Sequence, residues 1–191
     1  MRWLTAVLLA SALNAQDAQP TEMPIFGVSV LLPAGLTGQV YAIKENSDRL
    51  PNFKKLKPIG TIYTYALAIT PREFTEGFPG IPERLEWFAI DYTGRFWIND
   101  PGEYTFILTS DDGSKLYIDD KRVIDNDDLH APQSIEGKVK LKPGIHSIRV
   151  PYFQGPRFHV ALVLEVIPPG GEKRIFSMQE FKPPSNLEEI P

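Results

Sequence analysis

Residues 102–166 read GEYTFILTSDDGSKLYIDDKRVIDNDDLHAPQSIEGKVKLKPGIHSIRVPYFQGPRFHVALVLEV. This stretch alternates apolar and polar side chains in short runs, and Asn, Asp, Pro and Gly separate the runs. Because successive side chains of a strand point to opposite faces, each run predicts a strand with one face in a core. Pro143-Gly144 fits a type II turn between two such strands. The stretch therefore indicates an antiparallel, all-β fold.

The same reading extends to the rest of the chain, in which 18 Pro and 14 Gly leave little room for long amphipathic helices. Strands are expected at 104–109, 116–119, 123–124, 138–141, 145–150 and 160–166, and upstream at 27–32, 39–43, 62–69, 87–91 and 95–98. Residues 92–94 are expected to link the strands at 87–91 and 95–98, residues 99–102 to form a turn, and residues 45–58 to form a loop with one helical turn. The pattern predicts a β-sandwich with long loops.

Both ends of the chain differ in composition from its middle. Residues 1–15 combine Arg2, a short apolar run and small residues, which predicts a secretory signal peptide rather than a membrane span. Residues 16–24 are expected to be a flexible leader, and 25–168 the folded domain. Residues 169–191 form a Pro-rich C-terminal tail, in which only Ile175, Phe176 and Phe181 are expected to dock.

The chain has no cysteine, which excludes a lipoprotein anchor. Export without disulfides is typical of a bacterial periplasm or surface, so we expect a periplasmic, cell-surface or extracellular protein. A net charge of −4 without a basic block argues against binding to nucleic acid or an anionic membrane. The sequence has no Gly-x-Ser-x-Gly elbow, no phosphate loop and no carboxylates spaced as in a glycosidase, so no enzyme is predicted.

Several motifs occur in a characteristic order in the decisive stretch. They are Gly102-x-Tyr104-x-Phe106, Ser110-Asp111-Asp112-Gly113-Ser114, Leu116-x-Ile118-Asp119, Val123-x-Asp125-Asn126, His130, Gly137, Leu141-x-x-Gly144-x-His146, and Tyr152-Phe153 with Gly155. In these features the chain resembles the PA-fourteen domain, the β-sandwich module of the anthrax-toxin protective antigen and of yeast flocculins and adhesins. A weaker match runs upstream through residues 35–41. The resemblance implies an antiparallel β-sandwich.

Asp111 and Asp112 are the candidate metal ligands. Neighbouring carboxylates on a strand point apart, but both can reach one ion if the peptide between them is cis, and a hard cation such as calcium prefers oxygen ligands. In the adhesins that the chain resembles, such a pair holds calcium, which binds sugar hydroxyls. The alternative is structural, with Ser110, Gly113 and Ser114 forming a turn in which the acids only satisfy backbone N–H groups.

A second loop, at residues 154–157, would complete the site. Gln154 offers an amide oxygen where the adhesins carry Asn, and it is a further candidate calcium ligand. Arg157 would repel a cation or hydrogen-bond a sugar directly. Tyr152 and Phe153 are candidates for stacking on a sugar face.

The intervening segment carries further polar residues. Asp125 and Asn126 are expected to end a strand and cap a polar loop, and Asp127 and Asp128 to be solvated acids. The three histidines are expected to be structural, because zinc needs several converging ligands.

The leading hypothesis is an exported, non-catalytic module that binds a glycan or a cell-surface polysaccharide through its end loops, with calcium as the candidate cofactor. The alternative is a protein-interaction or structural module of the same fold, with an exported protein as its partner and no affinity for sugar or calcium.

Overall fold

The computed structural model describes residues 35–81 and 86–183. The predicted signal peptide, the leader and the expected strand at 27–32 lie outside the described residues. Within them, all strand pairings are antiparallel and the only helices are two short 3-10 turns, η1 (Phe53–Lys55) and η2 (Phe74–Glu76). The all-β prediction is confirmed.

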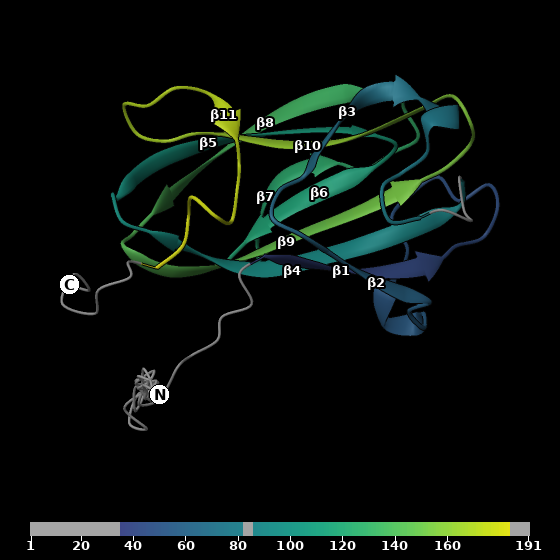
Figure 1. The fold of residues 1–191 in the computed structure, drawn as a ribbon, viewed down its shortest axis with the longest axis horizontal. Coiled ribbons are helices and arrows are strands. Elements are labelled where there is room, and N and C mark those ends of the chain that lie inside the picture. The colour runs from purple at the N-terminus through teal and green to yellow at the C-terminus, as the bar shows by residue number, and fades with distance from the viewer. Residues whose placement is uncertain (1–34, 82–85, 184–191) are drawn as a thin grey trace, which may run out of the picture. The chain divides into compact units, whose positions relative to one another are not determined.

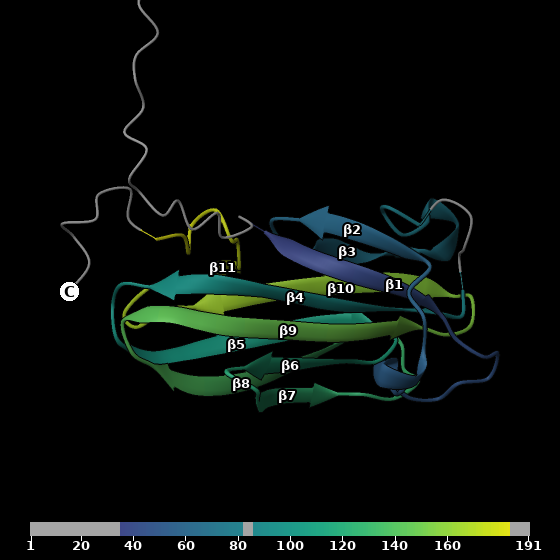
Figure 2. The ribbon, with the colours of Figure 1, turned by 90° about the horizontal axis from the view of Figure 1, so that it is seen from below.

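The strands form two facing sheets (Figures 1 and 2). One sheet has six strands in the order β2 (Gly60–Thr64), β1 (Leu36–Ala42), β4 (Phe88–Ile98), β9 (Gly144–Gln154), β6 (Ser114–Ile118) and β7 (Lys121–Asn126). The other has the order β11 (Arg174–Ile175), β10 (His159–Ile167), β5 (Gly102–Asp111) and β8 (Gln133–Leu141), with β3 (Ala68–Glu73) also pairing with β10. The fold is thus the expected antiparallel sandwich.

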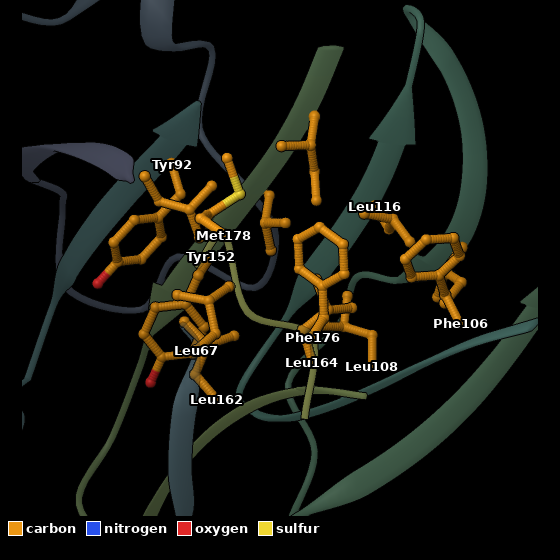
Figure 3. Close-up of a cluster of buried hydrophobic side chains, with 14 of the residues drawn as sticks. Leu67, Tyr92, Phe106, Leu108, Leu116, Tyr152, Leu162, Leu164, Phe176 and Met178 are labelled. Carbon is orange, nitrogen blue, oxygen red and sulfur yellow. The ribbon is translucent and has the colours of Figure 1, made fainter. Parts of the chain in front are cut away.

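The core lies between the sheets and follows the two-residue period. In β10, Val160, Leu162, Leu164 and Val166 are no more than 2% exposed and belong to one apolar cluster. Figure 3 shows side chains from both sheets meeting in this cluster, among them Tyr152 of the six-stranded sheet. Burial of such alternating side chains is the main force that holds the two sheets together.

The segment after β10 also enters the core. Phe176 is fully buried and meets the rings of Phe96 and Phe106 edge-on, with centroids 5.3 and 5.7 Å away. Phe181 stacks on Phe176 at 5.0 Å, and its carbonyl accepts a hydrogen bond from the amide of Trp97. The two aromatic residues expected to dock here do so, and they make this segment part of the folded unit.

Two strand predictions are wrong in detail. Residues 92–94 do not separate two strands, because β4 runs unbroken through Gly94, whose missing Cβ would lie 3.0 Å from Leu36 Cδ2. The run at 62–69 is not one strand, since β2 ends at Thr64 and β3 starts at Ala68 in the opposite sheet. The loop at 45–58 with its helical turn is confirmed by η1.

Candidate functional site

The acid pair sits where β5 ends. Asp111 is the last residue of β5, and Asp112 begins the two-residue link to β6, at the end of the sandwich where β9 also finishes (Figure 1). The peptide between the two acids is cis. Both side chains are buried, with residue exposures of 4% and 5%. Two neighbouring carboxyl groups are therefore held together in one largely dry place.

Asp112 connects three segments of the chain. One of its oxygens accepts a 2.7 Å hydrogen bond from the backbone amide of Gly155, and the other accepts a 3.3 Å bond from the amide of His130. The acid therefore fixes the loop after β7 and the loop after β9 against the β5–β6 link. These are long-range bonds, unlike the local turn capping that the structural alternative expected. The first of these oxygens, Oδ2, also accepts from Gln154 Nε2, whereas Oδ1 keeps a further lone pair, since a carboxylate has about four acceptor sites.

Glycines make this close approach feasible. A Cβ on Gly155 would lie 2.7 Å from Leu129 Cδ2 and 3.0 Å from Asp112 Oδ2. A Cβ on Gly113 would lie 2.3 Å from Phe153 Cε1. Contacts this short are repulsive for any larger residue, so the absence of a side chain is what lets both loops reach the acids.

Gln154 is fully buried, and its hydrogen bonds define its orientation. Its Nε2 lies 3.4 Å from Asp112 Oδ2 and 3.2 Å from the carbonyl of His159, while its Oε1 lies 2.5 Å from the Tyr152 hydroxyl. This orientation lets Nε2 donate to both acceptors, and the amide is assigned this way from its hydrogen bonds. Gln154 thus turns its amino group toward Asp112 and its oxygen away, which is not the orientation of a metal ligand.

The two acids are electrostatically unfavourable together. Burial and the neighbouring Asp112 carboxylate raise the pKa of Asp111 to about 6. Burial also raises the pKa of Asp112, although the hydrogen bonds from Gly155 and His130 oppose that shift. In the part of the chain that the structure describes, neither acid forms an ion pair with a lysine or arginine. The imidazoles of His159 and His130 act to lower the pKa of Asp111, so the positive charge near the pair comes from histidine.

A network of buried polar side chains lies next to the link between β5 and β6. The Ser110 and Ser114 hydroxyls lie 2.7 Å apart, and the Asn126 amide donates to Ser110 at 3.0 Å and to the carbonyl of Gln133 at 3.2 Å. Ser110, Ser114 and Asn126 are therefore held by one another rather than by backbone N–H groups. Asp125, expected beside them, instead lies at the surface in an ion pair with Arg122.

The residues predicted to contact a ligand differ in their exposure to solvent. Tyr152 and Phe153 have no exposed surface, so their side chains lie beneath the site rather than on it. The Tyr152 hydroxyl lies 2.7 Å from the carbonyl of Asp111. Arg157 is exposed, and its Nε lies 3.3 Å from Glu86 Oε2, so an acid outside the pair engages its charge.

Sequence reasoning missed two exposed apolar side chains at this end. Phe158 is 73% exposed in the loop after β9, and Leu129 is 40% exposed in the loop whose His130 amide binds Asp112. The feature that could have revealed them in the sequence is a large apolar residue within a loop that is otherwise polar and rich in turn-forming residues. Large apolar side chains that stay in water on loops are often used for binding.

No larger cluster of metal-binding side chains surrounds the acid pair or lies elsewhere in the described residues. Among residues 35–81 and 86–183, no cluster of three or more His, Cys, Asp or Glu side chains is placed to hold an ion. Of the two adjacent acids expected in solvent, Asp128 is exposed. Asp127 is not, because its side chain is 6% exposed and bonded to Lys115 and to the amide of Leu50.

The sequence from 75 to 178, more than half of the chain, matches the family model of the PA14 domain. The chain belongs to the PA14 domain family. The β-sandwich and the acid-bearing link described above are thus features of a PA14 domain, and the resemblance noted in the sequence is confirmed. No curated protein matches this chain.

Solved structures with the same fold are distant in sequence. The PA14 domain is similar to the PA14 sugar-binding domain from an RTX adhesin (TM-score 0.61, 18% identity), covering 76% of this chain and 96% of that one. It is similar to the epithelial adhesin 9 A domain of Candida glabrata in complex with Galβ1-3GlcNAc (TM-score 0.55, 16% identity), covering 78% and 88%. It also resembles an anti-sigma factor domain-containing protein (TM-score 0.61, 20% identity), covering 79% of this chain and 49%, about half, of that chain.

In the described part of this PA14 domain, no helix is long and apolar enough to cross a membrane.

Proposed function

We propose that this PA14 domain is an exported, non-catalytic module that recognises carbohydrate at the end of the sandwich where Asp111 and Asp112 lie. The observation that carries the proposal is the buried acid pair without a lysine or arginine partner among the described residues, held between two loops that expose Leu129 and Phe158. Sugar-binding neighbours with the same fold support it.

The acid pair fits a calcium ion in its donor chemistry. Two adjacent carboxylates supply the hard oxygen ligands that calcium prefers, and a divalent cation would offset the burial and the repulsion from Asp112 that raise the pKa of Asp111. Asp111 and Asp112 would hold the ion, which would supply a positive centre for sugar hydroxyls. Gln154 would not be a ligand, because its amino group faces Asp112. It would instead orient Asp112 by hydrogen bonding.

The loops would supply the rest of the recognition surface. Phe158 projects a largely exposed aromatic ring, which can stack on the apolar face of a sugar. Arg157 is also exposed and has guanidinium donors beyond the one directed at Glu86. Tyr152 and Phe153 would support the loops from inside. This assignment moves the predicted stacking role from residues 152 and 153 to residue 158.

A glycan array probed with and without calcium tests the proposal. The purified protein should bind a defined set of glycans in a buffer that contains calcium, and this binding should disappear when a chelator replaces the calcium. The Asp111→Asn variant should bind no glycan in either buffer. Asp128→Asn, which removes an exposed acid at the same end, is the matched control and should bind like wild type. If wild type binds no glycan in either buffer, the carbohydrate proposal is wrong.

A second candidate is a structural or protein-interaction module. The hydrogen bonds from the Gly155 and His130 amides to Asp112 favour it, because they give that acid a role without any ligand. On this reading Asp111→Asn would leave the binding of an exported protein partner intact.

A further inference from the structure

A second concave site lies on the outer face of the six-stranded sheet. It is a pocket of about 270 Å³ between the loop at 50–54 and outward-facing residues of β6 and β9. Tyr117 and Arg149 face outward there, and they sit directly opposite each other in the β6–β9 pairing. Figure 2 shows η1, the end of this loop, beside the β6 and β9 strands. The volume is close to the lower limit of small-ligand pockets and suits one sugar-sized group.

Arg149 is held rigidly at the centre of this pocket. Its guanidinium carbon lies 5.7 Å from the ring centroid of Phe53 and 5.6 Å from that of Tyr117. Its Nε donates a 2.7 Å hydrogen bond to Asp91. Among the hydrogen bonds of the described residues this is the guanidinium's only one, so its two terminal amino groups keep their donors. A fixed, planar guanidinium with unused donors is well suited to a carboxylate.

The charges around the pocket favour an anion. Its cationic lining residues are Lys54, Lys115 and Arg149, whereas the whole chain has a net charge of −4. Lys115 is paired with Asp127 at 2.7 Å. Lys54 is exposed and has no ion-pair partner in the described part of the chain. Asp127, which also lines the pocket, and Asp91 offset the charges of Lys115 and Arg149, so Lys54 leaves a local excess of one positive charge.

The remaining wall is suited to a sugar ring rather than to a bare anion. Pro51 and Pro151 supply apolar surface beside the charged groups. The Asn52 side-chain oxygen accepts a hydrogen bond from the amide of Lys54 at 3.2 Å, which leaves its amino group to donate to a hydroxyl. A pocket that combines apolar walls with a few directed polar groups selects a ligand of matching pattern.

We propose that this pocket binds an acidic sugar, with the carboxylate of a uronate residue on Arg149 and Lys54 and its ring between Pro51 and Pro151. The site uses neither acid of the pair and needs no cation. It therefore goes beyond the carbohydrate site proposed above, and each can fail without the other.

Titrations followed by NMR test this proposal with the purified protein in chelator, so that the acid pair contributes no cation site. Methyl β-glucuronide is the probe, and methyl β-glucoside, acetate and sulfate are the comparisons. We expect the glucuronide to shift resonances of residues 50–54 and 149, and to bind at least about tenfold more tightly than each comparison. Binding of glucoside as tight as that of glucuronide would overturn the role of the carboxylate. Equal binding of acetate or sulfate would overturn the role of the sugar ring.

Three variants locate the binding. Lys54→Ala removes an exposed side chain and should weaken glucuronide binding about tenfold while the protein stays folded. Lys138→Ala removes an exposed lysine on the other sheet and should leave glucuronide binding unchanged. Asp111→Asn should also leave glucuronide binding unchanged. Unchanged binding in Lys54→Ala, or equal losses in Lys54→Ala and Lys138→Ala, would place the sugar elsewhere and contradict the proposal.

Discussion

The backbone amide of Gly155 donates a 2.7 Å hydrogen bond to the carboxylate of Asp112, which precedes it by 43 residues. This bond joins the link after β5 to the loop after β9. It places the exposed loop residues next to the acid pair, and it relies on the absence of a side chain at residue 155. The geometry of the candidate site therefore depends on this contact.

Substitution of Gly155 by alanine should destabilise the protein. The new Cβ would lie 3.0 Å from Asp112 Oδ2, which hydrogen bonds hold in place, and 2.7 Å from Leu129 Cδ2, an exposed side-chain end that can move, so we expect a loss near the lower end of the ~1–3 kcal/mol typical of overpacking. Urea denaturation measures the effect. Gly60→Ala is the control, because the nearest atom to its new Cβ would be 4.0 Å away. It should cost nothing, and equal losses in both variants would show that the contact at Gly155 is not tight.

Stability without metal should fall as the pH rises toward 6. The pKa of Asp111 rises from 3.8 to about 6 on folding, so between these values the folded protein binds more protons than the unfolded chain. The free energy of unfolding therefore decreases with pH across this window and levels off above it. Burial shifts the pKa of Asp112 in the same direction.

The Asp111→Asn variant isolates this effect. It should flatten the decrease between pH 4 and pH 6 and make the metal-free protein more stable than wild type at pH 7, since it removes a buried charge at nearly constant shape. Denaturation curves measured across this pH range in chelator provide the comparison. A profile that Asp111→Asn leaves unaltered would show that the surroundings do not raise the pKa of Asp111.

Truncation of Phe176 to alanine should destabilise the domain strongly. The ring is fully buried among Phe96, Phe106 and Phe181, and Phe→Ala in a core typically costs about 3–5 kcal/mol. Ile175→Ala, at a neighbouring side chain that is 36% exposed, should cost much less. Thermal denaturation compares the two. Similar small losses would mean that the segment after β10 is not part of the cooperative unit.

The sandwich could be predicted from alternation wherever one strand face is buried and the other is partly exposed, as in β6, whereas β10 is largely buried on both faces. The alternation of apolar and polar residues did not predict the strand limits correctly where the packing of particular residues determines the path of the backbone. Gly94 was expected in the link between two strands, but it sits within β4, where Leu36 of the neighbouring strand approaches closely. The run at 62–69 has neither Gly nor Pro, so nothing local marks the point at which the chain crosses between sheets.

The candidate site was predictable only in part. The adjacent acids indicated a shared site, and they do lie together in a buried link. The roles of Gly155 and His130 were not predictable, because both act through backbone amides whose direction depends on tertiary structure. The burial of Asp127 was missed for the same reason, since its partner amide belongs to Leu50, 77 residues away.

The most direct test of the central claim is the effect of calcium on the melting temperature of wild type, Asp111→Asn and Asp128→Asn. At a hundredfold excess over Kd, a ligand that binds only the folded state adds about 2.7 kcal/mol, or about 5–10 °C for a protein of this size. We predict such a rise for wild type and Asp128→Asn and none for Asp111→Asn. No rise in wild type, or an equal rise in Asp111→Asn, would contradict a cation site at the acid pair.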